Sequence, residues 1–313
     1  MTETDMPAND EAAADPTKLT ADLVRQGERT VDNLKRLFAV VFALSFGIAG
    51  NGAYTKLKPV LLSGNSPPGW LWVLNIEMMA VFLVTAAVFY HQSVKFLDIR
   101  YAKTPLSEAH PWGFAADYIQ LVLTAAPFFL MANSLGHEVT NKVGYVWYFA
   151  SYVVLLGFGL VLLVISEVRH SRFIRHGIWG ERIAPEEIER ESLLRAYWMV
   201  MNGTILMILL FGFWYSSSRT CSAHPRFVAD AWFLYAFGIV ALIRDYLDFR
   251  WAWPFLYPIA DPASQVLAPL TWMATPRRRS LCITLGVLIV LLDGWMLYTL
   301  KLWDFAHWSA YCS

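Results

Sequence analysis

Long apolar runs alternate with polar and basic segments along the chain. An apolar run of about 17–25 residues is long enough for a helix to cross the ~30 Å hydrocarbon core of a bilayer. Such runs occur at residues 37–55, 70–92, 113–135, 144–166, 196–216, 228–248 and 280–301. Backbone amides in lipid must be satisfied within the segment, so continuous apolar runs predict helices and not barrel strands. The pattern predicts an all-α, polytopic membrane protein with a single bundle of seven transmembrane helices.

The segments before two of these spans also predict helix. Residues 19–36 have an amphipathic pattern, and they either lie on the inner leaflet or lengthen the first span. We favour lengthening, because few basic residues lie on the polar face. Residues 185–195 begin with Pro185, which suits a first helical turn. The first span itself is irregular, and we expect its outer end to unwind at Gly47, Gly50, Asn51 and Gly52.

Basic residues predict the orientation. Lys and Arg concentrate before the first span, after the second, between the fourth and fifth, and between the sixth and seventh. The positive-inside rule therefore places the N-terminus in the cytoplasm and the C-terminus outside. Residues 1–18, which are acidic and carry no basic, apolar leader, are expected to be a disordered cytoplasmic tail. Residues 19–313 form one transmembrane domain, with cytoplasmic loops at 167–195 and 249–279.

Composition agrees with this prediction. The chain is 57% hydrophobic and 16% charged, whereas soluble domains are about 45–50% apolar and about 25% charged. The formal net charge of zero gives no reason to expect a nucleic-acid partner. We expect an integral protein of a bacterial plasma (inner) membrane. Its expected partners are the lipid bilayer, protons or small cations, and a membrane-protein partner or a second copy of the chain.

Polar residues inside apolar spans are costly and are the first place to look for function. At 1.5 Å per residue, Glu77 and Asp293 lie roughly 10 Å from the outer ends of their spans. Asp117, Gln120 and Asn202 form a lower group near the inner face. No Lys or Arg lies at mid-span to pair with these residues. A carboxyl without a basic partner in a low dielectric is either neutral or binds a cation, which predicts a proton or cation pathway. The alternative is that each acid is protonated and hydrogen-bonded to a neighbouring helix.

A second group of polar residues lies at the inner ends of two spans. His91, Lys95 and Asp98 share one helical face, and Arg244 and Asp248 share another by their i, i+4 spacing. Charges at this level either form an ordinary interfacial ion-pair layer or serve as a cytoplasmic gate or docking face.

The sequence gives no cofactor and no metal site. It has no HExxH, HxxxH or CxxCH motif, and the absence of GxSxG argues against a serine hydrolase. The third span faintly resembles that of microbial rhodopsins. A retinal Schiff base needs a lysine in the middle of the seventh span, and Lys301 stands at its outer end, which excludes that family. A membrane enzyme acting on a lipid is the third reading of function.

The cysteines predict one bridge. Cys221 and Cys312 both fall outside by the charge argument, and an oxidising compartment makes them a disulfide candidate. The alternative is two free or intermolecular thiols. Cys282, at the inner end of the seventh span, is expected to be a small apolar filler.

Two functions follow from these features. The first is movement of protons or small cations through a pathway lined by the intramembrane acids. The second is a membrane sensor or accessory subunit that acts through its cytoplasmic loops.

Overall fold

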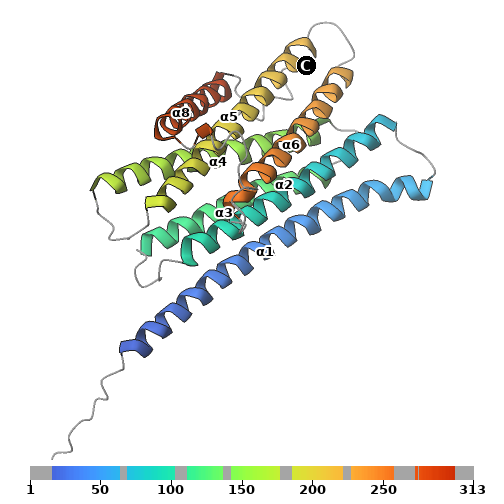
Figure 1. The fold of residues 1–313 in the computed structure, drawn as a ribbon. Coiled ribbons are helices and arrows are strands. Elements are labelled where there is room, and N and C mark those ends of the chain that lie inside the picture. Colours follow the sequence, from blue (N-terminus) through green and yellow to red (C-terminus); the bar gives the residue numbers. More distant parts are fainter. Residues whose placement is uncertain are drawn as a thin grey trace, which may run out of the picture.

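The computed structural model describes residues 16–63, 69–102, 111–136, 142–176, 185–220, 227–256, 272–273 and 275–299. Within them the chain forms seven long helices, and the all-helical prediction is confirmed. The helices pack as a bundle with α1 at one edge and α8 at the opposite edge (Figure 1). Their bounds are α1 Pro16–Ser63, α2 Gly69–Ala102, α3 Pro111–Gly136, α4 Lys142–His176, α5 Pro185–Thr220, α6 Phe227–Leu256 and α8 Pro276–Thr299.

Five of these helices are long and apolar enough to cross a membrane, which indicates an integral membrane protein in contact with lipid. They are α1, α2, α4, α5 and α8. In the part of α3 whose side chains are described, the apolar stretch is Leu121–Leu135. Helix α6 differs from the others because Arg244, Asp245 and Asp248 interrupt its apolar sequence.

The outer surface of the bundle is apolar. On α1, Phe38 and Phe42 are buried against the bundle, while Leu37, Val40 and Leu44 on the other side of the same helix are exposed. A helix at the surface of a soluble protein would carry polar residues on that outer side. Apolar side chains on both sides of α1 therefore suit a helix that contacts protein on one face and lipid on the other.

Helix α1 is continuous, and the prediction that its outer end unwinds is wrong. It passes through Gly47 and Gly50 without interruption, and a Cβ atom at either position would meet nothing within 4 Å. The Thr55 hydroxyl donates to the Asn51 carbonyl at 2.8 Å, four residues back along the helix. Unwinding in lipid would leave backbone groups without partners, and this cost keeps the helix intact despite its glycines.

The expected helical extensions are confirmed. Helix α1 begins at Pro16, so residues 19–36 lengthen the first span, and α5 begins at Pro185. Residues 1–15 of the predicted tail lie outside the described residues.

Contacts between helices set their relative directions. Helix α1 packs on α2 and α3, α2 packs on α6, and α5 packs on α4, α6 and α8. Helices α1 and α2 run antiparallel, as do α5 and α6, whereas α2 and α6 run parallel. The contacts that fix these directions are Phe38–Tyr90 and Phe46–Phe82 for α1 and α2, Asn202–Arg244 and Trp198–Asp248 for α5 and α6, and Glu77–Gly238 and Thr85–Asp245 for α2 and α6.

Aromatic rings fill the junction of α4, α5 and α6. The Phe149 ring lies 5.2 Å from the Phe213 ring, 5.1 Å from the Phe233 ring and 5.3 Å from the Phe237 ring, measured between centroids. Edge-to-face and stacked pairs of this kind add to the energy of apolar burial. They hold α6 against α4 and α5, and so position the charged residues of α6 inside the bundle.

Candidate functional site

Three charged residues of α6 meet in the interior, and we name Arg244, Asp245 and Asp248 the α6 charge cluster. The Arg244 side chain is 1% exposed and the two aspartate side chains are 0% exposed. Arg244 Nη1 donates to Asp245 Oδ1 at 2.6 Å, and Arg244 Nη2 lies 3.0 Å from Asp248 Oδ2. A buried charge is tolerated only when it is paired, and the guanidinium fork can reach two carboxylates at once.

Side chains from neighbouring helices complete the cluster. The Thr85 hydroxyl of α2 donates to Asp245 Oδ2 at 2.6 Å. On α5, Trp198 Nε1 donates to Asp248 Oδ1 at 2.8 Å, and Asn202 Oδ1 accepts from Arg244 Nε at 2.9 Å. The guanidinium carbon also lies 4.7 Å from the centre of the Phe89 ring of α2, a cation–π contact. The cluster therefore ties α2, α5 and α6 together.

The charges of the cluster do not balance when both acids are ionised. Arg244 stays protonated in proteins, so its single positive charge faces two carboxyl groups. Thr85, Trp198 and Asn202 contribute hydrogen bonds and no charge. The cluster then carries one net negative charge, or it holds one additional proton and is neutral. Because the two acids share Arg244, that proton belongs to the pair and not to either residue alone.

Two tyrosines of α4 lie beside the cluster. The Tyr148 hydroxyl donates to the Met78 carbonyl of α2 at 2.9 Å. The Tyr152 hydroxyl is one helical turn further along α4, is buried, and has no hydrogen-bond partner among the described residues. It interacts electrostatically with Asp245. A buried hydroxyl without a partner is unusual, and here it lies next to an imbalanced pair of acids.

Glu77 lies on α2 against α6. A Cβ atom added to Gly238 of α6 would lie 2.6 Å from Glu77 Cδ, so the Glu77 carboxyl group packs directly against the backbone of α6 at Gly238. Glu77 Oε2 is buried without a hydrogen-bond partner in the described part of the chain. Glu77 precedes Thr85 by eight residues, which places it roughly 12 Å from the cluster along the helix.

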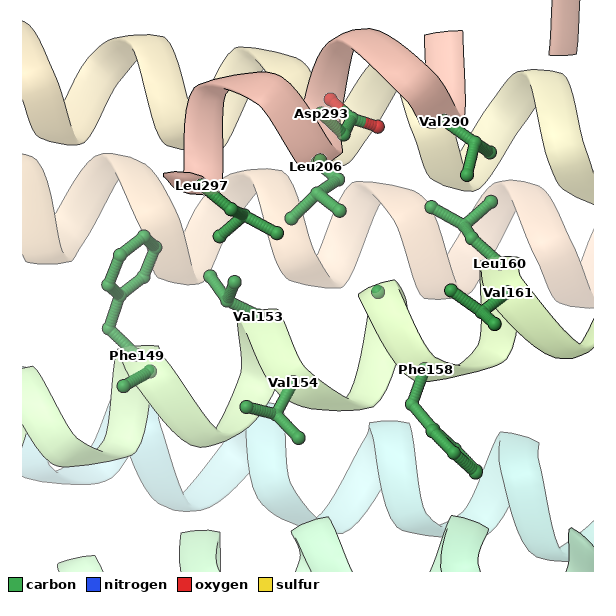
Figure 2. A pocket seen from close by; sticks show the side chains of 13 residues that line it. Phe149, Val153, Val154, Phe158, Leu160, Val161, Leu206, Val290, Asp293 and Leu297 are labelled. Carbon is green, nitrogen blue, oxygen red and sulfur yellow. The ribbon is translucent and has the colours of Figure 1, made fainter. Parts of the chain in front are cut away.

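Asp293 occupies a different interface. It lies on α8, is 2% exposed, and neither of its carboxylate oxygens has a hydrogen-bond partner within the described residues. A Cβ atom at Gly203 of α5 would lie 3.6 Å from Asp293 Oδ2. Asp293 lines a cavity of about 390 Å³ between α4, α5 and α8 (Figure 2). Glu77 thus contacts α6 while Asp293 contacts α5, and the two acids do not share one helix interface.

The position of Arg244 differs from two expectations. The lower polar group was expected to have no basic partner, and for Asn202 this is wrong because Arg244 binds it. Arg244 was also expected at the interface, and the structure buries it. Side chains on a helix lean toward its N-terminus, so a long side chain in the C-terminal half of α6 reaches back into the bundle.

The remaining predicted residues are only partly described. His91 and Lys95 are half-buried on α2, and Cys282 is buried on α8. The backbones of Asp98, Asp117 and Gln120 lie in α2 and α3, but their side chains are outside the described residues. Cys221 and Cys312 also fall outside, so the disulfide stays a prediction.

Sequence reasoning missed part of the cluster. Asp245 directly follows Arg244 and therefore lies outside the i, i+4 spacing that linked Arg244 to Asp248. Three charged residues within five consecutive positions of an apolar helix were the available signal. Nothing in the sequence connects Trp198 or Thr85 to α6. These partners are 50 and 160 residues from the aspartates that they bind.

A second ion pair joins α4 to α5 with balanced charge. Arg195 Nε donates to Glu167 Oε2 at 2.8 Å, and the Ser192 hydroxyl donates to Glu167 Oε1 at 3.3 Å. This ion pair joins one base to one acid, whereas the α6 charge cluster joins one base to two acids. The contrast makes the α6 charge cluster the better candidate for a site that binds a charged ligand.

Comparison with protein-family models, curated proteins and solved structures gives no match for this chain. Within the described residues, no group of three His, Cys, Asp or Glu side chains is placed to hold a metal ion. The buried polar groups of α2, α5, α6 and α8 are therefore the basis for a functional proposal.

Proposed function

We propose that the chain spans a bacterial plasma membrane seven times and moves protons across it, with the α6 charge cluster as the proton-binding site. One observation carries the proposal: two buried carboxyl groups share a single guanidinium. Gain or loss of one proton switches the cluster between a neutral and a negatively charged state. Intramembrane acids of this kind form the proton relays of pumps and transporters.

The hydrogen bonds of the cluster favour a proton over a metal cation. Asp245 accepts from Arg244 on one oxygen and from Thr85 on the other, and Asp248 Oδ1 accepts from Trp198. Hard metal cations bind through several oxygen ligands at once. A proton needs only one lone pair, and Asp248 Oδ2, whose contact among the described residues is the ion pair with Arg244 Nη2 at 3.0 Å, retains one.

A line of buried polar groups supports a route to the cluster. It begins at Glu77, whose Oε2 has no partner in the described residues, and continues past the hydroxyls of Tyr148 and Tyr152 to Asp245. These groups lie where α2, α4 and α6 meet. Hydroxyl groups both donate and accept hydrogen bonds, so they can relay a proton between two acids.

The second candidate is a sensor or accessory subunit. The observation in its favour is the dense pairing of Arg244, which contacts two acids and Asn202. A cluster of this kind can lock three helices in one register without binding any ligand. In this case, activity would depend on the cytoplasmic loops and not on a proton.

Proton flux into liposomes tests the proposal. The purified protein is reconstituted with a pH-sensitive dye inside, and a potassium diffusion potential drives protons inward. We expect flux with the wild-type chain, and a loss to the level of protein-free liposomes in Asp245→Asn and Asp248→Asn. The matched control is Asp32→Asn, because Asp32 is an exposed acid of α1. The control should keep wild-type flux.

Two results would count against proton movement. The first is a wild-type chain that conducts no better than protein-free liposomes. The second is full flux in both Asp245→Asn and Asp248→Asn, which would leave the cluster with a structural role alone and favour the accessory subunit.

A further inference from the structure

Three arginines stand at the beginning of α8. Arg277 and Arg278 are exposed, and Arg279 is half-buried. Helix α8 is long and apolar enough to cross a membrane from Pro276 onward, so these side chains lie where the span meets the aqueous interface. Neither Arg277 nor Arg278 forms an ion pair among the described residues. The start of α8 therefore carries two positive charges that the described part of the chain does not balance.

The two exposed arginines stand at the end of an apolar stripe on the same helix. Leu281, Leu285 and Leu288 are 57%, 43% and 57% exposed. At about 3.6 residues per turn, the direction of these leucines falls between the directions of Arg277 and Arg278. On a helix that crosses a membrane, exposed leucines contact lipid chains. Positive charge therefore caps the lipid-facing side of α8.

Trp272 belongs to the same surface. The Arg278 guanidinium carbon lies 5.2 Å from the centre of the Trp272 ring, and Arg278 Nη1 donates to the Trp272 carbonyl at 3.4 Å. Trp272 is 48% exposed, whereas the next residue, Met273, is buried in a cluster with Tyr197 of α5 and Ala252 of α6. Tryptophan rings favour the headgroup level of a bilayer. The buried Met273 therefore anchors an aromatic ring and a guanidinium group together at that level.

We propose that Trp272, Arg277 and Arg278 form a binding surface for an anionic phospholipid. The lipid phosphate lies at the two guanidinium groups, whose planar forks can each donate two hydrogen bonds to it, and one acyl chain lies along Leu281 and Leu285. A headgroup with net negative charge matches the unbalanced positive charge. The adjoining leucines argue for a lipid over a soluble anion, which would not contact them. The surface does not include the α6 charge cluster and does not rest on proton movement.

Native mass spectrometry of the purified protein in detergent tests the proposal. Dissociation constants are measured for phosphatidylglycerol and for phosphatidylcholine with identical acyl chains, so that only the headgroup differs. We expect the wild-type chain to bind phosphatidylglycerol roughly 10–30-fold more tightly, because each basic residue near an anionic lipid contributes about fivefold in affinity. Arg277→Gln combined with Arg278→Gln should reduce this preference to less than about threefold.

Two further pairs of variants separate charge from folding and from position. Arg277→Lys with Arg278→Lys keeps both charges and should keep most of the preference. Arg25→Gln with Arg29→Gln removes the same charge from exposed positions of α1, at the edge of the bundle opposite α8 (Figure 1). This pair should leave the preference unchanged. An equal loss in the α1 pair would attribute the preference to net charge and overturn the proposed surface.

Glycerol phosphate separates a lipid from a soluble anion. We expect an excess of glycerol phosphate to leave phosphatidylglycerol bound, because it lacks the acyl chains that contact the leucines. If it displaces the lipid, the surface binds free phosphate esters and the lipid claim is wrong. Equal binding of the two lipids by the wild-type chain, or a full preference in the variant with both arginines replaced by Gln, would also overturn the proposal.

Discussion

Arg244 places a permanent positive charge inside the bundle, and the arrangement of its neighbours follows from that charge. A guanidinium group does not lose its proton in proteins, so the cluster changes charge only through Asp245 and Asp248. Asn202 and the ring of Phe89 then occupy the parts of the guanidinium that the acids leave open. At the residue scale, loss of the base and loss of an acid should therefore have unequal effects.

We predict that Arg244→Gln destabilises the protein more than Asp248→Asn does. The first change leaves two buried acids without a base, and removal of one partner from a buried ion pair typically costs about 3–5 kcal/mol. The second change leaves one acid and one base, whose charges balance. Chemical denaturation in detergent micelles, followed by tryptophan fluorescence, gives the two free energies of unfolding.

The control for this prediction removes every charge of the cluster. Arg244→Met combined with Asp245→Asn and Asp248→Asn should recover much of the stability lost in Arg244→Gln, because no unpaired charge remains. Equal losses in Arg244→Gln and Asp248→Asn would show that charge balance does not govern the stability of the cluster.

At the scale of elements, α5 separates two polar interfaces. Successive residues on a helix point about 100° apart, so neighbours in sequence face different partners. Asn202 faces Arg244 of α6, whereas Gly203, the next residue, faces Ile289 and Asp293 of α8. The charge cluster and the Asp293 cavity therefore lie on adjacent sides of one helix.

Close contact between α5 and α8 depends on small residues. A Cβ atom at Gly286 would lie 2.8 Å from Met199 Cβ, and one at Gly203 would lie 2.7 Å from Ile289 Cγ2. Both distances are shorter than van der Waals contact. Small residues allow helices to approach in this way, and the approach supplies much of the packing energy between helices in lipid.

We predict that Gly286→Ala destabilises the protein by about 1–3 kcal/mol, the usual cost of overpacking. The opposing atom, Met199 Cβ, is fixed to its backbone, so α5 and α8 must move apart. Denaturation in micelles measures the change. The matched control is Gly50→Ala on α1, where a Cβ atom meets nothing within 4 Å and no loss is expected. Equal stability of the two variants would contradict the close contact.

The sequence predicted the helices well and their contacts poorly. Apolar runs located each helix, and Pro185 located the start of α5, because length, hydropathy and first-turn preference are local properties. The cluster depends on which faces meet, and that is decided by packing. Arg244 and Asn202 were assigned to separate groups, although one hydrogen bond joins them. The extent of α1 was clear from its pattern, whereas the glycines that suggested unwinding proved compatible with a continuous helix.

At the scale of the whole molecule, the number of spans is decided by α3 and α6. Within the described residues, five other helices meet the length and hydropathy of a membrane span and these two do not. A single Arg near the centre of a spanning helix costs about 2.5–3.5 kcal/mol in insertion measurements. In α6, the acids that pair with Arg244 reduce this cost, and α6 lies along α2 from Gly238 to Asp245. Parallel packing of α6 against α2 agrees with seven alternating spans.

Labelling from outside the cell distinguishes seven spans from five. With the N-terminus in the cytoplasm, seven spans place the segment between α3 and α4 outside and the segment between α4 and α5 inside. If α3 and α6 do not cross, both locations are reversed, while the C-terminus is outside in either case. A fusion of a reporter to Ser313 therefore tests orientation but not the number of spans. The segments beside α4 are the informative positions.

We predict that a cysteine at Thr140 reacts with a membrane-impermeant maleimide on intact cells and that a cysteine at Gly180 reacts only after the cells are opened. Each is introduced singly into a chain whose Cys221 and Cys312 are replaced by Ala, while the buried Cys282 is kept. The chain without an added cysteine measures the background. The physical reason is that α3 crosses the bilayer, and with the C-terminus outside α6 must then cross as well, with its charges paired internally. Labelling of Gly180→Cys but not Thr140→Cys on intact cells, together with a C-terminus outside, would reduce the bundle to five spans and remove the α6 charge cluster from the membrane interior.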